Sequence, residues 1–239
     1  MRLYELQMKK SKNHDAGPVP LTKLVLPEWD GSNAKGKETR ELILKTALST
    51  LVDEGYQAMS MRRVAAKCGL QFGNLTYHYP TREDLITELL EAVIRGYEAH
   101  GDAIAGKEHG TVDVRLARIF GFALEDLRTK KTTHLFPELW ALSNHDPVIA
   151  ERVQALYYRA RAPLEGIVEE LRPDLPSEVR TALSVFMSST IEGLSVFAGY
   201  EKPFEPWIPA FTRIASSSFI KMLKDFSIDD LGDIDLTSG

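Results

Sequence analysis

The sequence predicts an all-α protein of about nine helices, on three observations. From about residue 38 onward, apolar residues recur three and four positions apart, which is the spacing of one face of a helix. No stretch alternates β-branched and polar residues between hairpin turns, as a half-buried strand would. Self-similarity at a period of about 20 to 50 residues is also missing, so we expect a helical bundle rather than a solenoid.

The composition excludes several classes of protein. The 239 residues, of which 44% are hydrophobic and 26% charged, are enough to bury a core, so a disulfide-stapled or metal-stapled mini-protein is excluded. No uninterrupted apolar run approaches the roughly 18 residues of a membrane span. The single cysteine, Cys68, and an N-terminus without the features of a secretory signal predict a cytoplasmic protein. We expect Cys68 to be a core residue rather than a redox sensor.

Charge is divided unevenly along the chain. The first 86 residues hold 13 basic and 10 acidic residues, a net charge of +3, whereas residues 87–239 hold 16 and 24, a net charge of −8. The overall charge of −5 therefore averages a modestly basic part and a strongly acidic part, which indicates separate roles.

Residues 1–34 contain prolines and glycines but no periodic apolar face, which predicts a flexible arm. Its lysines are expected to be solvated, with contact to nucleic-acid phosphates as the alternative: Lys9, Lys10, Lys12 and Lys23.

Four helices are predicted in the next part of the chain. The first is placed at about 38–53, and the second runs from a Ser60 cap to a break at residues 68–70. The third lies at about 71–79, and the fourth runs from a capping box at Thr81–Asp84 to about Ala99. Gly55 ends the first helix, and Pro80 ends the third because the residue before a proline avoids the helical region.

Longer amphipathic helices follow beyond Gly110. We place them at about 112–129, 134–144, 147–171, 177–198 and 207–226, with Lys130-Lys131 as one of the breaks between them. Asp146 caps the helix that begins at Pro147. The acidic residues after 228 predict a frayed tail.

The stretch from Ser60 to Tyr79 has the pattern of a helix-turn-helix. Ala65 allows a close crossing of two short helices, and Gly69 makes the turn. Leu75 and Val64 are expected to lock the pair into the core.

Over residues 38–86 the chain resembles the TetR family of bacterial transcriptional regulators. The match rests on Asp53-Glu54-Gly55-Tyr56, on Val64-Ala65 with Gly69-Leu70, and on the stretch from Gly73 to Leu85. The resemblance implies an all-helical homodimer with a DNA-binding head and a C-terminal domain that binds a ligand and dimerises. We accordingly divide the chain into an arm (1–34), a helix-turn-helix domain (35–86) and a ligand-binding and dimerisation domain (87–239).

A recognition helix at 71–79 would fit the major groove with its first turn facing base edges. The predicted DNA-binding residues are Ser60, Arg62, Gln71, Phe72, Gly73, Asn74, Thr76, Tyr77, His78 and Arg82. Asn74 suits an adenine and Thr76 a thymine, while the resemblance implies phosphate contacts for Tyr77, His78 and Arg82. Phe72 is open between a thymine-methyl contact and a core position. Tyr79 is expected to pack beneath the fourth helix.

The C-terminal half carries no sharp motif. An apolar effector pocket is predicted from aromatic residues on these helices, with plain core as the alternative: Phe120, Phe136, Trp140, Tyr157, Tyr158 and Phe186. His134, His145 and Asp146 lack metal-ligand spacing, so neither a metal nor another cofactor is expected. Dimerisation is predicted through stripes on the last two helices: Val179, Leu183, Phe186, Met187, Thr190 and Leu194 on one, and Trp207, Phe211, Ile214, Ser218 and Met222 on the other.

The sequence therefore predicts a ligand-responsive repressor that binds a palindromic operator in double-stranded DNA as a homodimer and answers to an unidentified small-molecule effector. Two alternatives stay open, a helical protein-interaction module and an enzyme acting on a hydrophobic small molecule. No nucleophile, phosphate-binding loop or metal signature supports the enzyme.

Overall fold

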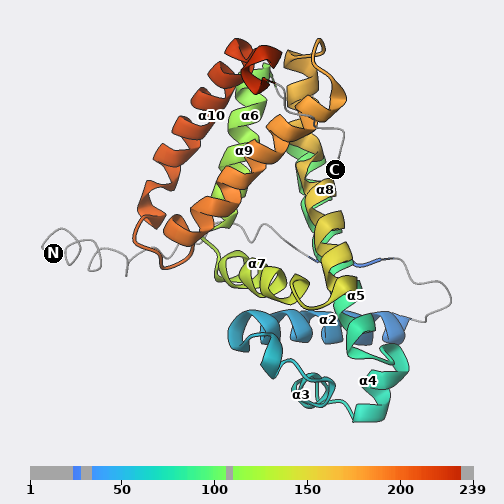
Figure 1. Ribbon diagram of the computed structural model, residues 1–239. Coiled ribbons are helices and arrows are strands. Elements are labelled where there is room, and N and C mark those ends of the chain that lie inside the picture. The colour runs from blue at the N-terminus through green and yellow to red at the C-terminus, as the bar shows by residue number, and fades with distance from the viewer. Residues whose placement is uncertain (1–23, 28–33, 106–109, 233–239) are drawn as a thin grey trace, which may run out of the picture. The chain divides into compact units, whose positions relative to one another are not determined.

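The computed structural model describes residues 24–27, 34–105 and 110–232, and within these residues it contains nine α-helices and no strand (Figure 1). The all-α prediction is confirmed. Packing divides the chain into two units, which we describe separately. The helix-turn-helix unit comprises residues 21–99 and 130–159, and the bundle unit includes residues 100–129 and 160–239.

In the helix-turn-helix unit, five helices and the first half of a sixth surround one apolar core. The elements are α2 (Ala34–Glu54), the 3-10 helix η1 (Tyr56–Ala58), α3 (Met61–Lys67), α4 (Phe72–His78), α5 (Arg82–Ala105), α7 (Lys130–Ser143) and the beginning of α8 (Pro147–Leu171). The core holds fully buried residues from α2, α3, α4, α5 and α7, such as Leu44, Val64, Leu75, Leu89 and Leu135. Packing groups α7 and the start of α8 with the helix-turn-helix, although both lie after the predicted domain boundary at residue 86. The division of function at that boundary stays a prediction.

Local signals in the sequence set several helix ends. The Ser60 hydroxyl accepts from the Arg63 amide at 3.3 Å, which caps α3. Thr81 and Asp84 exchange the two bonds of a capping box before α5, at 3.0 and 3.1 Å. The Asp146 carboxylate accepts from the second and third residues of α8. These three predictions are confirmed.

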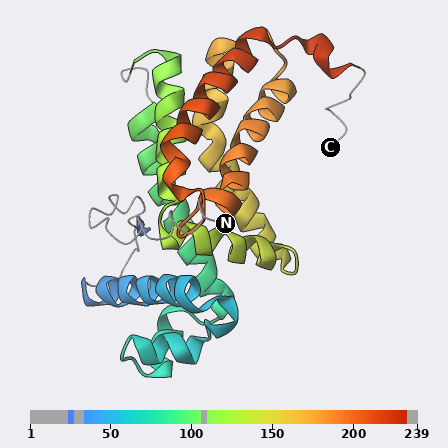
Figure 2. The ribbon, with the colours of Figure 1, turned by 90° about the vertical axis from the view of Figure 1, so that its left-hand side faces the viewer.

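The bundle unit packs α6 (Val112–Asp126), the end of α8, α9 (Ser177–Ala198) and α10 (Ile208–Asp225), with the short 3-10 helices η3 (Glu205–Trp207) and η4 (Ile228–Leu231). Helix α10 packs on α6 and on α9 (Figure 2). Phe120 and Phe219 stack in the core of the bundle unit with ring centroids 5.3 Å apart. Arg115, buried at the start of α6, pairs with Glu170 at 2.7 Å.

Two predicted boundaries need correction. Helix α2 begins at Ala34 rather than at residue 38. The predicted break at Lys130-Lys131 is wrong, because α7 begins at Lys130, whose ammonium lies 2.5 Å from the Asp53 carboxylate. The turn after α6 instead uses residues 127–129, where the Leu127 carbonyl accepts from the Tyr200 amide.

Most of the predicted arm, including its four lysines, lies outside the described residues. Leu24–Pro27 are described, and they contact the helix-turn-helix unit, while the arm as a whole stays a prediction. The Val25 amide donates to the Ala92 carbonyl of α5 at 3.2 Å, and Leu24 and Leu26 pack against the core of the helix-turn-helix unit. We call this segment the strap.

Helix α9 is long and apolar enough, by length and composition alone, to cross a membrane. A single such helix is weak evidence, because core helices of soluble proteins pass the same test. Only 28% of its most apolar window is buried in the structure, so α9 leaves much apolar surface uncovered.

Candidate nucleic-acid interface

Helices α3 and α4 form the predicted helix-turn-helix. Gly69 adopts a φ of +68°, a conformation that side chains rarely tolerate, and a Cβ there would meet nothing within 4 Å. The turn is closed by the Leu70 amide, which donates to the Ala65 carbonyl at 2.9 Å. Backbone conformation rather than space is therefore what requires glycine at this position.

Helix α4 is held by a single buried side chain. Leu75 is fully buried beside Val64 in the same core, which confirms their predicted packing. The remaining positions of α4 and its N-cap Gln71 are exposed or half-buried, and Tyr77 is 83% exposed. A helix with one anchor turns the rest of its surface outward.

We group the exposed residues of α4 and its N-cap with those at the start of α3 and call this set the recognition surface. It contains Ser60, Arg62, Gln71, Phe72, Gly73, Asn74 and Tyr77, all predicted to bind DNA and all exposed. Thr76 is half-buried, and its hydroxyl lies 3.2 Å from the carbonyl oxygens of Phe72 and Gly73. Its hydroxyl is thus partly engaged within the helix.

Phe72 is not a core residue. Its side chain is 46% exposed, and the guanidinium carbon of Arg62 lies 5.7 Å from the centroid of its ring. The open question of its position is thereby resolved in favour of the surface.

The C-terminal end of α4 is tied to α2 and α5. His78 is half-buried, its ring meets Tyr77 edge-on at 5.2 Å, and its carbonyl accepts from Arg40 at 3.5 Å. Burial, together with the charge of Arg40, holds the pKa of His78 below its ordinary value. The imidazole is therefore favoured in its neutral form.

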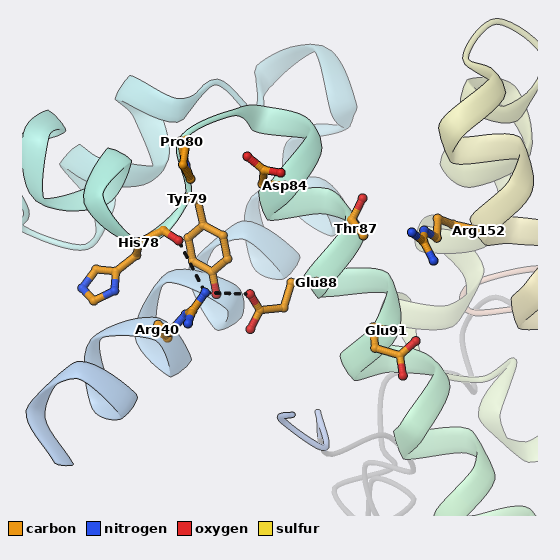
Figure 3. Close-up of a pocket in the computed structure, with 9 residues that line it drawn as sticks. All are labelled: Arg40, His78, Tyr79, Pro80, Asp84, Thr87, Glu88, Glu91 and Arg152. Atoms are coloured by element: carbon orange, nitrogen blue, oxygen red, sulfur yellow. Dashed lines mark hydrogen bonds and ion pairs between the residues drawn. The ribbon is translucent and has the colours of Figure 1, made fainter. Parts of the chain in front are cut away.

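Tyr79, as predicted, packs beneath α5 and is 1% exposed. Burial raises the pKa of its phenol well above the ordinary range. Arg40 lies over the ring and pairs with Glu88 of α5 at 3.2 Å. Figure 3 shows these groups on one side of a cleft of about 580 Å³ in the helix-turn-helix unit, with Arg152 of α8 at the other side.

Arg82 has an internal partner. Its guanidinium lies 3.6 Å over the Tyr56 ring and donates to the Tyr56 carbonyl. The Tyr56 amide donates to the Glu138 carboxylate of α7 at 2.9 Å. Arg82 therefore joins the start of α5 to η1, and its predicted phosphate contact stays a prediction.

Family models match both parts of the chain. The model described as "Bacterial regulatory proteins, tetR family" matches residues 43–89, and the model "BetI-type transcriptional repressor, C-terminal" matches residues 113–223. The chain belongs to the TetR family. It is a helix-turn-helix transcriptional regulator, and the α3–α4 pair is the DNA-binding motif of that family.

Individual relatives agree with the TetR assignment. An uncharacterised HTH-type transcriptional regulator in the dhlA 5′ region of Xanthobacter autotrophicus is 27% identical over 164 residues, 66% of this chain and 78% of the relative. A crystal structure of a transcriptional regulator from Pseudomonas aeruginosa PAO1 has a TM-score of 0.67 at 19% identity, covering 79% of this chain and 91% of that one. A regulator from Saccharomonospora viridis in complex with choline has a TM-score of 0.59 at 17% identity, covering 79% and 97%. The two structures show that the TetR fold is shared.

The six predicted effector residues are divided between the two units. Phe136, Trp140 and Tyr157 meet in the helix-turn-helix unit, where Trp140 Nε1 donates to the Tyr157 hydroxyl at 2.7 Å. Phe120 is core of the bundle unit, and Phe186 packs edge-on against Phe219 while 59% exposed. Tyr158 is exposed and joins neither group. The first three form what we call the aromatic cluster.

The candidate metal ligands have other roles. Across residues 24–27, 34–105 and 110–232, no group of three or more His, Cys, Asp or Glu side chains is arranged to hold a metal ion. Asp146 caps α8, His145 is exposed, and His134 Nδ1 lies 3.1 Å from the Val52 carbonyl.

Sequence reasoning missed the contacts of α7 with the end of α2 and with η1. Lys130, His134 and Glu138 follow each other at intervals of four, so they share one face of α7. They contact respectively the Asp53 carboxylate, the Val52 carbonyl and the Tyr56 amide. The spacing of four residues could have indicated a shared face of α7, but it does not identify the residues that this face contacts.

Proposed function

We propose that this TetR-family chain is a ligand-responsive repressor that binds a palindromic operator as a homodimer in the bacterial cytoplasm. The observation that supports DNA binding is the recognition surface, on which seven of the residues predicted to bind DNA are exposed. Asn74 and Gln71 on it carry the amide groups that pair with adenine edges, and Arg62 adds a cation. Phosphate contacts from Tyr77, His78 and Arg82 would set the position of the helix on the duplex.

Dimerisation through α9 and α10 is supported by exposed apolar side chains on both helices. Val185, Phe186, Val196 and Phe197 of α9 are all more than 40% exposed, and Ile214 of α10 is 60% exposed. Such a surface on two neighbouring helices suits a two-fold four-helix interface. The α9 stripe was expected to face both its own core and a second copy, and its members Val179, Leu183 and Met187 lie in the core of the bundle unit.

The aromatic cluster is our candidate for effector binding. Its three rings lie on α7 and α8, and α7 packs on α2, which in turn packs on α3 of the DNA-binding motif, so a ligand there would act on the motif through α2. Aromatic rings attract quaternary ammonium groups by cation–π interaction. Choline, bound by the Saccharomonospora viridis relative, is therefore the first effector to test.

Fluorescence anisotropy with duplexes from the DNA flanking the gene tests the proposal. We expect binding that weakens steeply with salt, because lysines and arginines displace counterions from the phosphates. Tyr77→Ala should weaken binding to all sequences, and Asn74→Ala should change the preferred base at one position of each half-site. Tyr158→Ala removes another exposed tyrosine distant in sequence from the recognition surface and serves as the matched control.

Selection from a randomised duplex library completes the test. Enrichment of a palindrome by the wild-type protein supports a dimer on DNA, and sedimentation at micromolar concentration reports the dimer directly. A protein that enriches no sequence, or that sediments as a monomer with and without DNA, contradicts the proposal. Addition of choline that leaves operator affinity unchanged removes choline as the effector without removing the DNA-binding function.

A further inference from the structure

Arg62 differs from the other cations of α3. Arg63 and Lys67 both donate to the carboxylate of Glu54 at the end of α2. Arg62 is exposed and makes no ion pair with any residue that the structure describes. Its guanidinium lies instead near the ring of Phe72, with 5.7 Å between its carbon and the ring centroid.

Phe72 contributes little to the core. Its ring is 46% exposed, and it is absent from the apolar side chains that pack around Leu75. An exposed phenylalanine at the first position of α4 thus has one described partner, the guanidinium of the residue ten positions earlier. Arginine is well suited to stacking on an aromatic face, because its planar group keeps its N–H donors available around the edge.

We propose that Arg62 reads a guanine in each operator half-site through two hydrogen bonds, to O6 and N7, and that Phe72 is the positioning residue that orients the guanidinium. This inference rests on the proposed DNA-binding function. Guanine is the base whose major-groove edge offers two adjacent acceptors, and the arginine fork matches both. Lysine presents a single ammonium group and lacks this planar fork.

The competing role for Arg62 is a phosphate contact. A phosphate contact would strengthen binding to every sequence alike and would be kept in part by lysine. A guanine contact adds discrimination between bases, which should be lost when the guanidinium is replaced. Base preference rather than affinity therefore separates the two roles.

The experiment uses the full-length chain and a randomised duplex library. Wild type, Arg62→Ala, Arg62→Lys, Phe72→Leu and Arg63→Ala are each selected separately, and their affinities are then measured on the enriched site and on its single-base-pair variants. Arg63→Ala removes the same charge from the neighbouring exposed arginine and is the matched control. Circular dichroism and thermal midpoints establish that each variant is folded.

We expect both Arg62 variants to lose roughly tenfold to a hundredfold of the preference for guanine at one position of each half-site. Phe72→Leu should lose about two- to fivefold of that preference, since it removes an exposed cation–π contact and leaves the arginine in place. Arg63→Ala should bind all duplexes somewhat more weakly, with a shallower dependence on salt, but keep the base preference of the wild type.

Two results overturn the inference. One is an Arg62→Ala protein that binds all duplexes more weakly by the same factor, which assigns Arg62 to a phosphate. The other is a Phe72→Leu protein with the full guanine preference, which removes the positioning role. If the wild-type protein enriches no sequence, the proposed function fails as a whole, and this outcome is distinguishable from the other two.

Discussion

Leu75→Ala should release α4 from the protein while leaving most of the fold in place. Leu75 is the only buried side chain of this seven-residue helix, and a helix this short does not persist in water without tertiary contacts. Loss of three buried carbon atoms removes about 2.4 kcal/mol of transfer free energy, and the cavity beside Val64 adds up to about 2 kcal/mol. We therefore expect the free energy of unfolding to fall by about 2.5 to 4.5 kcal/mol.

For a chain of this length, such a loss corresponds to a drop of about 5 to 15 °C in the thermal midpoint. Hydrogen exchange by mass spectrometry should show faster exchange in α4 than in α5, and operator affinity should fall more than the loss of folded protein explains. Leu89→Ala is the matched control, because Leu89 is equally buried but lies on the long helix α5. Exchange in α4 that matches the wild type, together with unchanged DNA affinity of the folded variant, would refute the reasoning.

Three further predictions concern contacts within the helix-turn-helix unit. Val25→Pro removes the amide that donates to Ala92 and should lower the free energy of unfolding in urea by about 0.5 to 1.5 kcal/mol, whereas Val25→Ala keeps the donor and should change it less. Glu138→Ala leaves the Tyr56 amide without its charged acceptor and should cost about 1.5 to 3 kcal/mol in the same assay; an unchanged midpoint would contradict this role. Because burial and Arg40 lower the pKa of His78 in the folded state, the unfolded chain binds more protons below pH 6.5, so stability should fall as pH drops from 7 toward 5. His78→Gln should flatten that part of the pH profile, and an identical slope in both proteins would exclude His78 as its source.

The parts of the fold that were predicted from sequence are those set by local chemistry. The bounds of α8 and α9 agree with the predicted ranges because Asp146-Pro147 and Pro176 fix where each helix begins. The turn at Gly69 and the buried position of Leu75 were likewise predicted. A glycine where the backbone needs a positive φ, and an apolar residue at helical spacing, can both be recognised from a few neighbouring residues.

The contacts that were missed join residues far apart in the chain. Tyr56 and Glu138 are 82 positions apart, and Tyr56 and Arg82 are 26 apart, so no local pattern names them as partners. Leu24–Leu26 is an apolar run too short to show a periodic face, and only the fold supplies the face of α5 on which it packs. For Phe72 the sequence left two positions open, because an aromatic residue at helical spacing suits both core and surface.

The bond from the Tyr56 amide to Glu138 also sets a tolerance for movement. Its length is 2.9 Å, and a hydrogen bond stretched much beyond 3.5 Å no longer holds, so the Glu138 carboxylate and the Tyr56 amide can separate by only about 0.6 Å along the bond before it is lost. A movement of α7 that draws the carboxylate away by more than this must either carry η1 with it or leave a part-buried amide without its charged acceptor. Because η1 is the segment that joins α2 to α3, displacement of α7 is transmitted first to the entrance of the helix-turn-helix.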